Sequence, residues 1–445
     1  MLVRLFLSDD SLPAEPVAAH FTGEEIAALL AADLVRVDST GGGAAWLATA
    51  RLTPVRSGDR EWWIAADSGF GSHEAGPPSD LVFNGHNPLT RQFLLLMPSV
   101  GGRVLDLCSG TGIDAMACDP ATSTVIAVDV APRATHFAAF NVWLNGADHV
   151  KPLQGDLYAP AEGRQFDWVI AHPPYVPTLR DVAVYRDGGE MGDAVLQRIV
   201  EGLPAHLGVG GSFFILAIGL DGTEGRYEDR VRSWMGAAGR EFDLVFGIVD
   251  FKPVEQYARF LVDRAHGGQP GDLDRWTEIF SSHGVKASVY GALVGRRTAP
   301  GSGECQTRRV ALAPEGKAGS FEWMLRWFEW CRQPGLRERL LASRPKLAPA
   351  VKVHVTYSVS DARFLAEAYR LTNPDAPFAA DMETDGWVMT LLSGFDGTRT
   401  PAEVVAAAHP GVLPEDLKED HLVEVVRAFA ERRALVLDGP EAPGR

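Results

Sequence analysis

A glycine-rich stretch that joins an apolar run to a helical pattern limits the folds open to this chain more than any other feature. Residues 103–108 read R-V-L-D-L-C, a short apolar run typical of a buried parallel strand. S-G-T-G follows, and then I-D-A-M-A, which indicates the first turns of a helix. Glycines at such a turn let the backbone approach a ligand, and the helix start offers free N–H groups. The turn therefore predicts a ligand site at Asp106, Cys108, Ser109, Gly110, Thr111 and Gly112.

Two further strands are expected to end at the same edge of the sheet. Residues 125–129 form a second buried run, and its last residue, Asp129, comes 19 residues after Gly110. In a doubly wound sheet a carboxylate at this offset accepts hydrogen bonds from ribose hydroxyls, and Val130 lies next to it. A later strand, residues 166–171, leads into His172-Pro-Pro-Tyr175. Nicotinamide and flavin enzymes share the first two features, but the spacing G-x-G-x-x-G is absent here and the third feature argues against them.

The length and composition predict a soluble protein of two or three domains. The chain has 445 residues, 46% of them hydrophobic and 22% charged. Its formal charge of −16 argues against a nucleic-acid partner, which would need clustered Lys and Arg. The four cysteines have no metal-ligand spacing, and we expect no metal. No apolar run approaches the length of a membrane span, and the N-terminus lacks the pattern of a secretory signal, so we expect a cytoplasmic protein.

Composition and periodicity divide the chain into three predicted domains. Residues 1–80 suggest a small α+β or winged-helix-like unit, either a cap or a substrate-capture module. A Gly/Pro/Ser linker is expected near its end, at residues 71–78. Residues 81–298 alternate strands with helices, which predicts a seven-stranded, mostly parallel, doubly wound α/β sheet. Residues 299–445 form an accessory domain with a winged-helix-like end. Its long helix is acidic (Glu415, Asp416, Glu419, Asp420 and Glu424), which favours a protein contact or brace over DNA reading.

Together, the D-x-x-x-G-x-G turn, the acid after the next strand and the x-P-P-Y motif resemble class I S-adenosylmethionine-dependent methyltransferases. The core is similar to the HemK-like release-factor glutamine methyltransferases, and the whole chain to actinobacterial three-domain proteins built on that core. Other matching stretches are F-N-V-W-L-N-G at residues 140–146 and Y-R-D-G-G at residues 185–189. The resemblance implies S-adenosyl-L-methionine as the cofactor. It also implies that Asp156 faces the adenine amino group and that Leu157 lies against the ring.

In the part of the predicted site that would bind the methyl acceptor, one residue differs from the family. The family has Asn ahead of Pro-Pro-Tyr, where it orients the target nitrogen, and this chain has His172. A neutral imidazole also accepts a hydrogen bond, and near neutral pH it is able to take a proton. We therefore expect His172 and Tyr175 to be catalytic and His172 also to contact the cofactor. The substrate-binding candidates are Asn84, His86, Pro173, Pro174, Tyr175, Tyr185 and Arg186.

The function predicted from the sequence is N-methylation of a small molecule or peptide. Methylation of protein glutamine, or of an amino group in rRNA or DNA, is the alternative enzyme reading. A binding protein that senses the cofactor without turnover is the alternative from another functional class. Asn84 and His86 are equally natural as polar turn residues before a helix, and Asp156 as a turn residue. His172 could also serve only to hold its turn through a backbone hydrogen bond.

Overall fold

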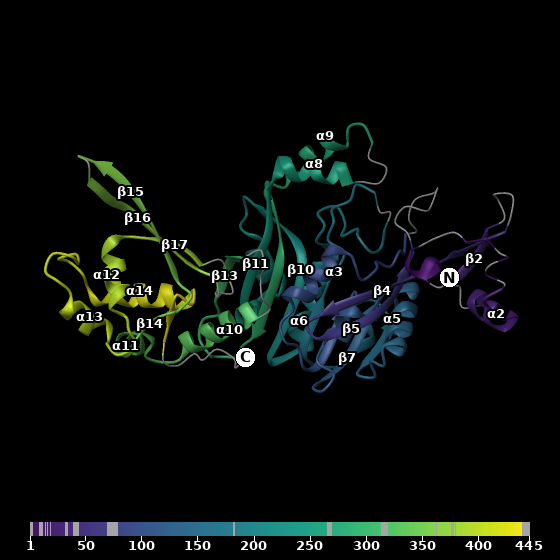
Figure 1. The fold of residues 1–445 in the computed structure, drawn as a ribbon, viewed down its shortest axis with the longest axis horizontal. Helices are drawn as coiled ribbons and strands as arrows, with labels where there is room; N and C mark the ends of the chain where they lie inside the picture. The colour runs from purple at the N-terminus through teal and green to yellow at the C-terminus, as the bar shows by residue number, and fades with distance from the viewer. Residues whose placement is uncertain are drawn as a thin grey trace. The chain divides into compact units, whose positions relative to one another are not determined.

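Strands and helices alternate along the central part of the chain, as the sequence predicted. The strands, which contain the apolar runs, form one large sheet (Figure 1). The computed structural model describes residues 3–437 except the segments 9–11, 14, 16, 18, 32–33, 39–43, 69–78, 181–182, 265–268, 313–318, 362, 375–377 and 379. The linker predicted at residues 71–78 lies outside the described residues. Within them, no helix is both long and apolar enough to cross a membrane.

The main sheet has eight strands in the order β13-β11-β12-β10-β9-β6-β7-β8, one more than the seven expected. The additional strand is β13, which pairs in parallel with β11. The pairs β8–β7, β7–β6, β6–β9 and β9–β10 are also parallel. The strands are β6 Gly102–Leu107, β7 Ser123–Asp129, β8 Val150–Gln154, β9 Phe166–Ala171, β10 Leu207–Gly222, β11 Phe242–Pro253, β12 Val285–Arg297 and β13 Thr307–Ala311.

Helical segments connect these strands, and their apolar residues complete the core. Val104, Leu105, Val169 and Ile170 of the two central strands have no exposed surface. Complete burial on both faces explains why these segments are continuous apolar runs and show no alternation. The helical segments are α3 Pro88–Leu96, α4 Ile113–Ala117, α5 Pro132–Leu144, η2 Ala159–Ala161, α6 Ala194–His206, α7 Tyr227–Trp234, η3 Gly236–Glu241, α8 Val254–Arg264 and α9 Asp272–Ser282.

The N-terminal region contains a short α-helix and several short strands, and its existence as a separate domain stays a prediction. A capping box begins its helix, since Thr22 Oγ1 accepts from the Glu25 amide and Glu25 accepts from Thr22. Residues 45–57 form two strands, because β3 pairs with β1 and β2 whereas β4 pairs with β5. The elements are η1 Val3–Leu7, β1 Leu12–Pro13, α2 Gly23–Ala31, β2 Val35–Asp38, β3 Ala45–Ala48, β4 Ala50–Ser57 and β5 Arg60–Asp67.

The C-terminal region contains a tryptophan-rich helix, a three-stranded sheet and a helical end. Trp323 and Trp327 lie on one face of this helix and are buried. The acidic helix begins at Glu419, so Glu415 and Asp416 precede it, and Arg337 pairs with Glu419 and Asp420. The elements are α10 Gly319–Arg332, α11 Leu336–Ala342, β14 Lys346–Leu347, β15 Lys352–Ser360, β16 Arg363–Asn373, β17 Ala380–Thr384, α12 Gly386–Gly394, α13 Pro401–Ala407, α14 Glu419–Glu431 and β18 Leu435–Val436.

The chain divides into two compact units. One comprises residues 1–239 and 250–293, and the other comprises residues 240–249 and 294–445. The domain boundaries expected near residues 80 and 298 stay predictions. The residues discussed below as a candidate site all lie in the first unit.

Candidate functional site

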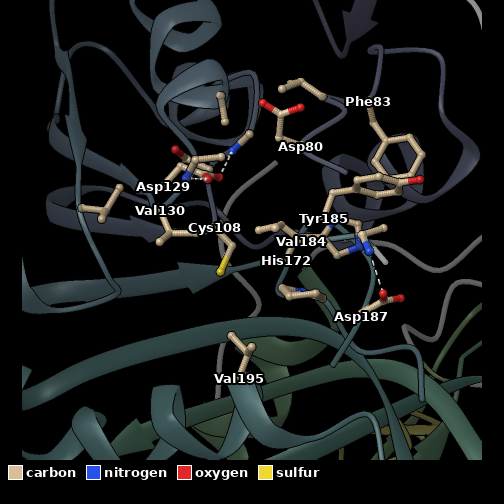
Figure 2. A pocket seen from close by; sticks show the side chains of 18 of the residues that line it. Asp80, Phe83, Cys108, Asp129, Val130, His172, Val184, Tyr185, Asp187 and Val195 are labelled. Carbon is tan, nitrogen blue, oxygen red and sulfur yellow. Dashed lines mark hydrogen bonds between the residues drawn. The ribbon is translucent and has the colours of Figure 1, made fainter. Parts of the chain in front are cut away.

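The order of the parallel strands reverses at β6, which has β7 on one side and β9 on the other. Parallel strands end at one edge of the sheet, so the residues that follow β6, β7, β8 and β9 come together there. Such a reversal leaves a crevice beyond the strand ends, the usual ligand position in open α/β sheets. A cavity of about 720 Å³ lies at this edge (Figure 2).

The glycine-rich turn is hydrogen-bonded to the acid at the end of the neighbouring strand. One carboxylate oxygen of Asp129 accepts a hydrogen bond from the Gly110 amide at 2.9 Å, and the other accepts from the Ala131 amide at 2.9 Å. Gly110 has a φ of 53°, and a Cβ placed there would meet no atom within 4 Å. Gly112 begins α4 with a φ of 76°, and its Cβ would lie 3.2 Å from the Ala138 side chain. Glycine at these two positions therefore leaves the backbone open to a ligand and lets α4 pack on α5.

Two non-glycine residues of the cavity wall adopt the left-handed backbone conformation. Cys108 follows β6 with a φ of 61°, and Leu157 follows β8 with a φ of 48°. Both line the cavity. Residues with side chains rarely occupy this region, at a cost of about 1–3 kcal/mol, and they concentrate at functional sites. The strain is thus located at the sheet edge that the sequence indicated as the site.

Most of the residues predicted for the site lie in the wall of this cavity. The structure brings together Cys108, Ser109, Gly110, Thr111, Asp129, Val130, Asp156, Leu157, His172, Pro174 and Tyr185. They come from four separate strand ends and the Y-R-D-G-G segment, so their proximity is a property of the tertiary fold.

The other predicted site residues do not line the cavity. Tyr175 is buried and packs on Tyr290, with ring centroids 6.0 Å apart. The side chain of Asn84 accepts a hydrogen bond from the His86 amide, as expected of a polar turn. Arg186 pairs with Asp187 at 3.0 Å. The rest of this group is Asp106, Gly112 and Pro173.

The His172 ring lies between two aromatic rings. Its centroid is 5.4 Å from that of Phe93 on α3 and 5.8 Å from that of Tyr175, and both pairs are stacked. Among the described residues no hydrogen bond to its ring nitrogens is found, so nothing here indicates that His172 holds its own turn. Burial lowers the pKa of His172 to about 4. The imidazole is therefore neutral at pH 7 and has a nitrogen lone pair available to a ligand.

Two adjacent acids lie beneath the glycine-rich turn. Asp106 and Asp114 are both buried, and neither oxygen of Asp106 has a hydrogen-bond partner among the described side chains and backbone. Burial, together with the charges of Asp114 and Asp129, raises the pKa of Asp106 well above its usual value. Burial raises the pKa of Asp114 to about 8. At neutral pH the Asp114 carboxyl is therefore mostly protonated, and of these two acids only Asp114 lines the cavity.

Side chains on α5 connect the N-terminal hairpin β4–β5 to the site through hydrogen bonds and an ion pair. The buried Asn141 accepts from the Ala65 amide at 2.7 Å and donates to the carbonyls of Ala65 and Thr111, at 2.9 and 3.0 Å. Arg133 pairs with Asp67, and Asp67 also accepts from the Val82 amide at 2.7 Å. Since Thr111 and Val82 both line the cavity, these contacts position its opposite walls.

Several lining residues were not predicted from the sequence. Asp80 and Phe83 precede α3, Asp187 lies within the Y-R-D-G-G segment, and Arg198 is on α6. Arg198 pairs with Asp156 at 2.7 Å. Phe83 is next to the candidate Asn84, and Asp187 lies within the stretch at residues 185–189 that resembles the family, so both had a local indication. Arg198 had none, because a single arginine on a helix is ordinarily a solvated side chain.

The residues present fit S-adenosylmethionine. Asp129 presents a carboxylate to the cavity for the ribose hydroxyls, and the open space at Gly110 leaves room for a ligand against the backbone. Asp156 and Leu157 lie at the end of β8, the position expected for adenine recognition. Within the described residues, no group of three or more His, Cys, Asp or Glu side chains could hold a metal ion.

Comparison with known proteins agrees with this geometry. Residues 87–224 match the family model of the methyltransferase small domain. The HemK-like character and the cofactor that the motifs predicted agree with this match, whereas the actinobacterial three-domain type stays a prediction.

The curated relatives each match about a quarter of the chain. The chain is 38% identical over 123 residues to the ribosomal protein uL3 glutamine methyltransferase of Bradyrhizobium diazoefficiens, which covers 25% of this chain and 39% of that protein. It is 32% identical over 128 residues to a putative protein N5-glutamine methyltransferase of Methanocaldococcus jannaschii, with 27% and 64% covered. A release factor glutamine methyltransferase of Xylella fastidiosa is 33% identical over 132 residues, with 27% and 47% covered.

The chain thus spans less than two thirds of the length of each of these relatives. Among solved structures, a putative SAM-dependent methyltransferase from Streptococcus mutans is 14% identical, with a TM-score of 0.32 and 55% of each chain covered.

Proposed function

We propose that this protein is an S-adenosylmethionine-dependent methyltransferase that methylates a nitrogen of a peptide or small molecule. The observation that carries the proposal is that Asp129, the glycine-rich turn and His172 open on one cavity at the strand reversal. The cofactor supplies an electrophilic methyl group on a sulfonium. The chain's own contribution is to hold donor and acceptor in line, which accounts for much of the acceleration in reactions of this kind.

The state of His172 favours an acceptor nitrogen of low basicity. An imidazole whose pKa is about 4 is a weak base at neutral pH, but it accepts a hydrogen bond from an N–H group. A carboxamide or aromatic amino nitrogen becomes strongly acidic once methylated, so even a weak base removes its proton. An aliphatic ammonium would keep its proton in front of such a residue. His172 can thus orient the acceptor as Asn does in the family.

The relatives support a carboxamide acceptor in particular. Those named above are glutamine methyltransferases of a ribosomal protein and of a release factor, and the matched segment includes the x-P-P-Y motif. A glutamine-containing peptide is therefore the first acceptor to test, and a small carboxamide is the second.

Replacement of Asp129 by Ala tests the cofactor assignment. The change removes acceptors for two ribose hydroxyls, and a hydrogen bond to a charged group contributes about 1.5–3 kcal/mol. We expect the dissociation constant for S-adenosylhomocysteine to rise at least about tenfold in calorimetry. The matched control is Asp167→Ala, since Asp167 lies outside the cavity and pairs with Arg103 on the surface. Equal affinity of wild type and Asp129→Ala would contradict the assignment.

Turnover separates an enzyme from a cofactor-sensing protein. Transfer of a labelled methyl group to a glutamine peptide or a carboxamide, detected by mass spectrometry, supports the enzyme. Tight cofactor binding together with no transfer to any nitrogen acceptor would favour the sensing protein instead.

A further inference from the structure

The acidic side chains of the cavity wall differ in how far neighbouring groups neutralise their charge. The lining acids are Asp80, Asp114, Asp129, Asp156 and Asp187, and the lining base is Arg198. Arg198 pairs with Asp156, and Asp187 is held by Arg186 and by the Ala183 amide at 2.7 Å. Asp114 is protonated at neutral pH, since burial raises its pKa to about 8. Among the described residues, this leaves Asp129 and Asp80 as the two lining acids that are neither paired with an arginine nor protonated in this way.

These two remaining charges have different surroundings. Asp129 is bound by two backbone amides and lies at the predicted ribose position. Asp80 is half-buried, and no hydrogen bond or ion pair to its carboxylate is found among the described residues. A carboxylate without a partner in the wall of a cavity is a site for a cation or a strong hydrogen-bond donor.

Asp80 is close in sequence to Phe83, which forms an aromatic pair with Tyr185, and both rings also line the cavity. Phe83 and Tyr185 meet edge to face, with ring centroids 4.8 Å apart and an interplanar angle of 89°. The Val184 amide donates to the Ser79 carbonyl at 2.8 Å, so the two segments that carry these rings are joined by their backbones. In Figure 2, Phe83 and Tyr185 appear on one side of the cavity and Asp129 and Val130 on the other, with His172 between them in this view.

Resting on the proposed function, we propose that Asp80, Phe83 and Tyr185 form the acceptor subsite, which binds a planar cationic group of the acceptor. An amidinium, guanidinium or aromatic ammonium group would place its charge against Asp80 and its face or edge against the rings. This recognition group is distinct from the weakly basic nitrogen at His172 that receives the methyl. Binding at such a remote group helps to hold the reacting nitrogen in line.

Three probes of nearly equal shape and different charge test the subsite. Benzamidinium, benzamide and benzoate carry charges of +1, 0 and −1 on the same planar framework. Each is titrated by ligand-observed NMR into the full-length protein loaded with S-adenosylhomocysteine, and in parallel into the unloaded protein. We expect benzamidinium to bind about tenfold more tightly than benzamide, and benzoate to bind most weakly.

Two variants and a control assign the preference to the residues named. Asp80→Asn should reduce the ratio between benzamidinium and benzamide to within about twofold and leave the affinity for S-adenosylhomocysteine unchanged. Tyr185→Leu should weaken all three probes by a similar factor. Asp167→Asn removes a surface carboxylate outside the cavity and should retain the wild-type order.

Other outcomes overturn the inference. Equal affinity for the three probes in wild type, or an undiminished preference in Asp80→Asn, would exclude Asp80 as the recognition group. A tenfold loss of S-adenosylhomocysteine affinity in Asp80→Asn would assign Asp80 to the cofactor. If wild type binds no S-adenosylhomocysteine, the proposed function fails, and the titrations of the unloaded protein decide the subsite separately.

Discussion

At the scale of single residues, His172 has the most direct consequence for chemistry. Its ring is held between Phe93 and Tyr175, and its nitrogens bond to no described residue. The pKa of about 4 makes it a hydrogen-bond acceptor over the whole physiological range. The unperturbed imidazole value of about 6.5 would have implied a proton acceptor that titrates near neutrality. Burial therefore favours the orienting role over the general-base role.

The pH profile of wild type and of His172→Asn distinguishes the two roles. Because the folded pKa is lowered, the active neutral form persists above about pH 4 and is lost as the pH falls through that value. We expect kcat/KM to show an acid limb near pH 4, not near 6.5, wherever the protein stays folded. If His172 orients, His172→Asn should retain activity within about tenfold. If it is the base, the loss should be about 10²–10⁴.

A second substitution controls for the structural role of this residue. His172→Ala removes the hydrogen-bond acceptor but leaves Phe93 and Tyr175 in place, so we expect a larger loss than in His172→Asn. Thermal unfolding of both variants shows whether the stack matters for folding. Wild-type turnover in both variants would remove His172 from the mechanism.

At the scale of elements, the coupling between α5 and β5 connects the N-terminal hairpin to the cavity. Two asparagines, Asn141 on α5 and Asn145 at the C-terminal cap of this helix, bond the backbone of alternate residues of β5 in the way a neighbouring strand would. Asn145 accepts from the Trp63 amide and donates to its carbonyl, both at 2.8 Å. Asn141 does the same at Ala65 and also reaches the Thr111 carbonyl in the glycine-rich turn. The hairpin is therefore part of the support for the site.

Replacement of Asn141 by Ala should weaken both folding and cofactor binding. The change leaves the buried amide and carbonyl of Ala65 and the Thr111 carbonyl without this partner. An unsatisfied buried polar group costs about 1–3 kcal/mol, so we expect a loss of at least about 2 kcal/mol in urea unfolding. Asn145→Ala is the matched control, because Asn145 caps the same helix and bonds the same strand but is only half-buried. A loss no larger than that of Asn145→Ala would contradict this role for Asn141.

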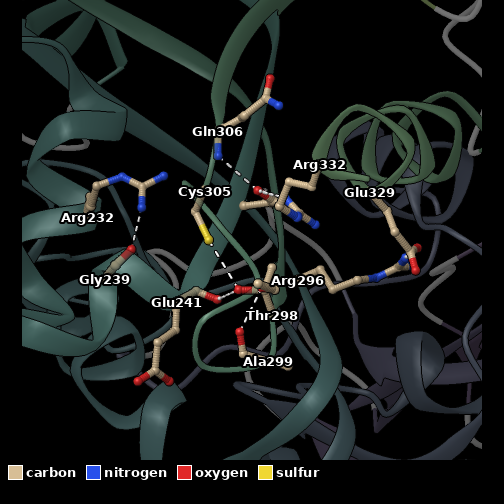
Figure 3. Close-up of polar contacts among 12 residues, drawn as sticks. Arg232, Gly239, Glu241, Arg296, Thr298, Ala299, Cys305, Gln306, Glu329 and Arg332 are labelled. Atoms are coloured by element: carbon tan, nitrogen blue, oxygen red, sulfur yellow. Dashed lines mark hydrogen bonds and ion pairs between the residues drawn. The ribbon is translucent and has the colours of Figure 1, made fainter. Parts of the chain in front are cut away.

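At the scale of the whole molecule, the second compact unit has its own buried polar centre. Asp243 on β11 is fully buried and accepts from Arg332 on α10, at 2.8 and 2.6 Å, and from the Gln306 amide at 2.9 Å. Figure 3 shows Arg332 and Gln306 among the polar contacts of this region. An ion pair of this kind is costly to break, because removal of one partner leaves a buried charge.

Arg332→Met should therefore destabilise the protein by about 3–5 kcal/mol. Denaturant unfolding followed by tryptophan fluorescence measures this, since α10 carries three tryptophans, Trp323, Trp327 and Trp330. The control is Arg337→Met, whose partners Glu419 and Asp420 are exposed, and we expect a loss below about 1 kcal/mol. Similar losses in the two variants would show that the burial of Asp243 is not decisive.

The charge of the whole chain predicts its behaviour toward nucleic acids. A formal charge of −16 opposes the counterion-release term that drives phosphate binding. We expect no appreciable binding to random duplex DNA at physiological salt in fluorescence anisotropy. Binding that falls steeply as salt is raised would reveal a basic groove and contradict the expectation.

Features that depend on neighbours in sequence were determined by the sequence alone. The capping boxes at Thr22 and Thr400 form within three residues, and both are present in the structure. The apolar runs around Asp106 and Asp129 form the predicted strands, because a strand buried on both faces is a continuous run of apolar residues. Adjacent parallel strands then bring their carboxyl ends together, so most of the residues predicted for the cofactor lie in the cavity wall, although Asp106 and Gly112 do not.

Features that depend on distant contacts were decided only by the tertiary structure. Tyr175 was predicted to face the substrate, but it packs on Tyr290 of β12, which no local pattern could indicate. Asp80 and Arg198 line the cavity because the segment before α3 and helix α6 meet across it. The pKa of His172 likewise follows from burial by elements far along the chain. Sequence patterns specify periodicity and turns. Burial, strand pairing and the part of the cavity wall that would bind the methyl acceptor depend on where the fold places segments that are far apart in the sequence.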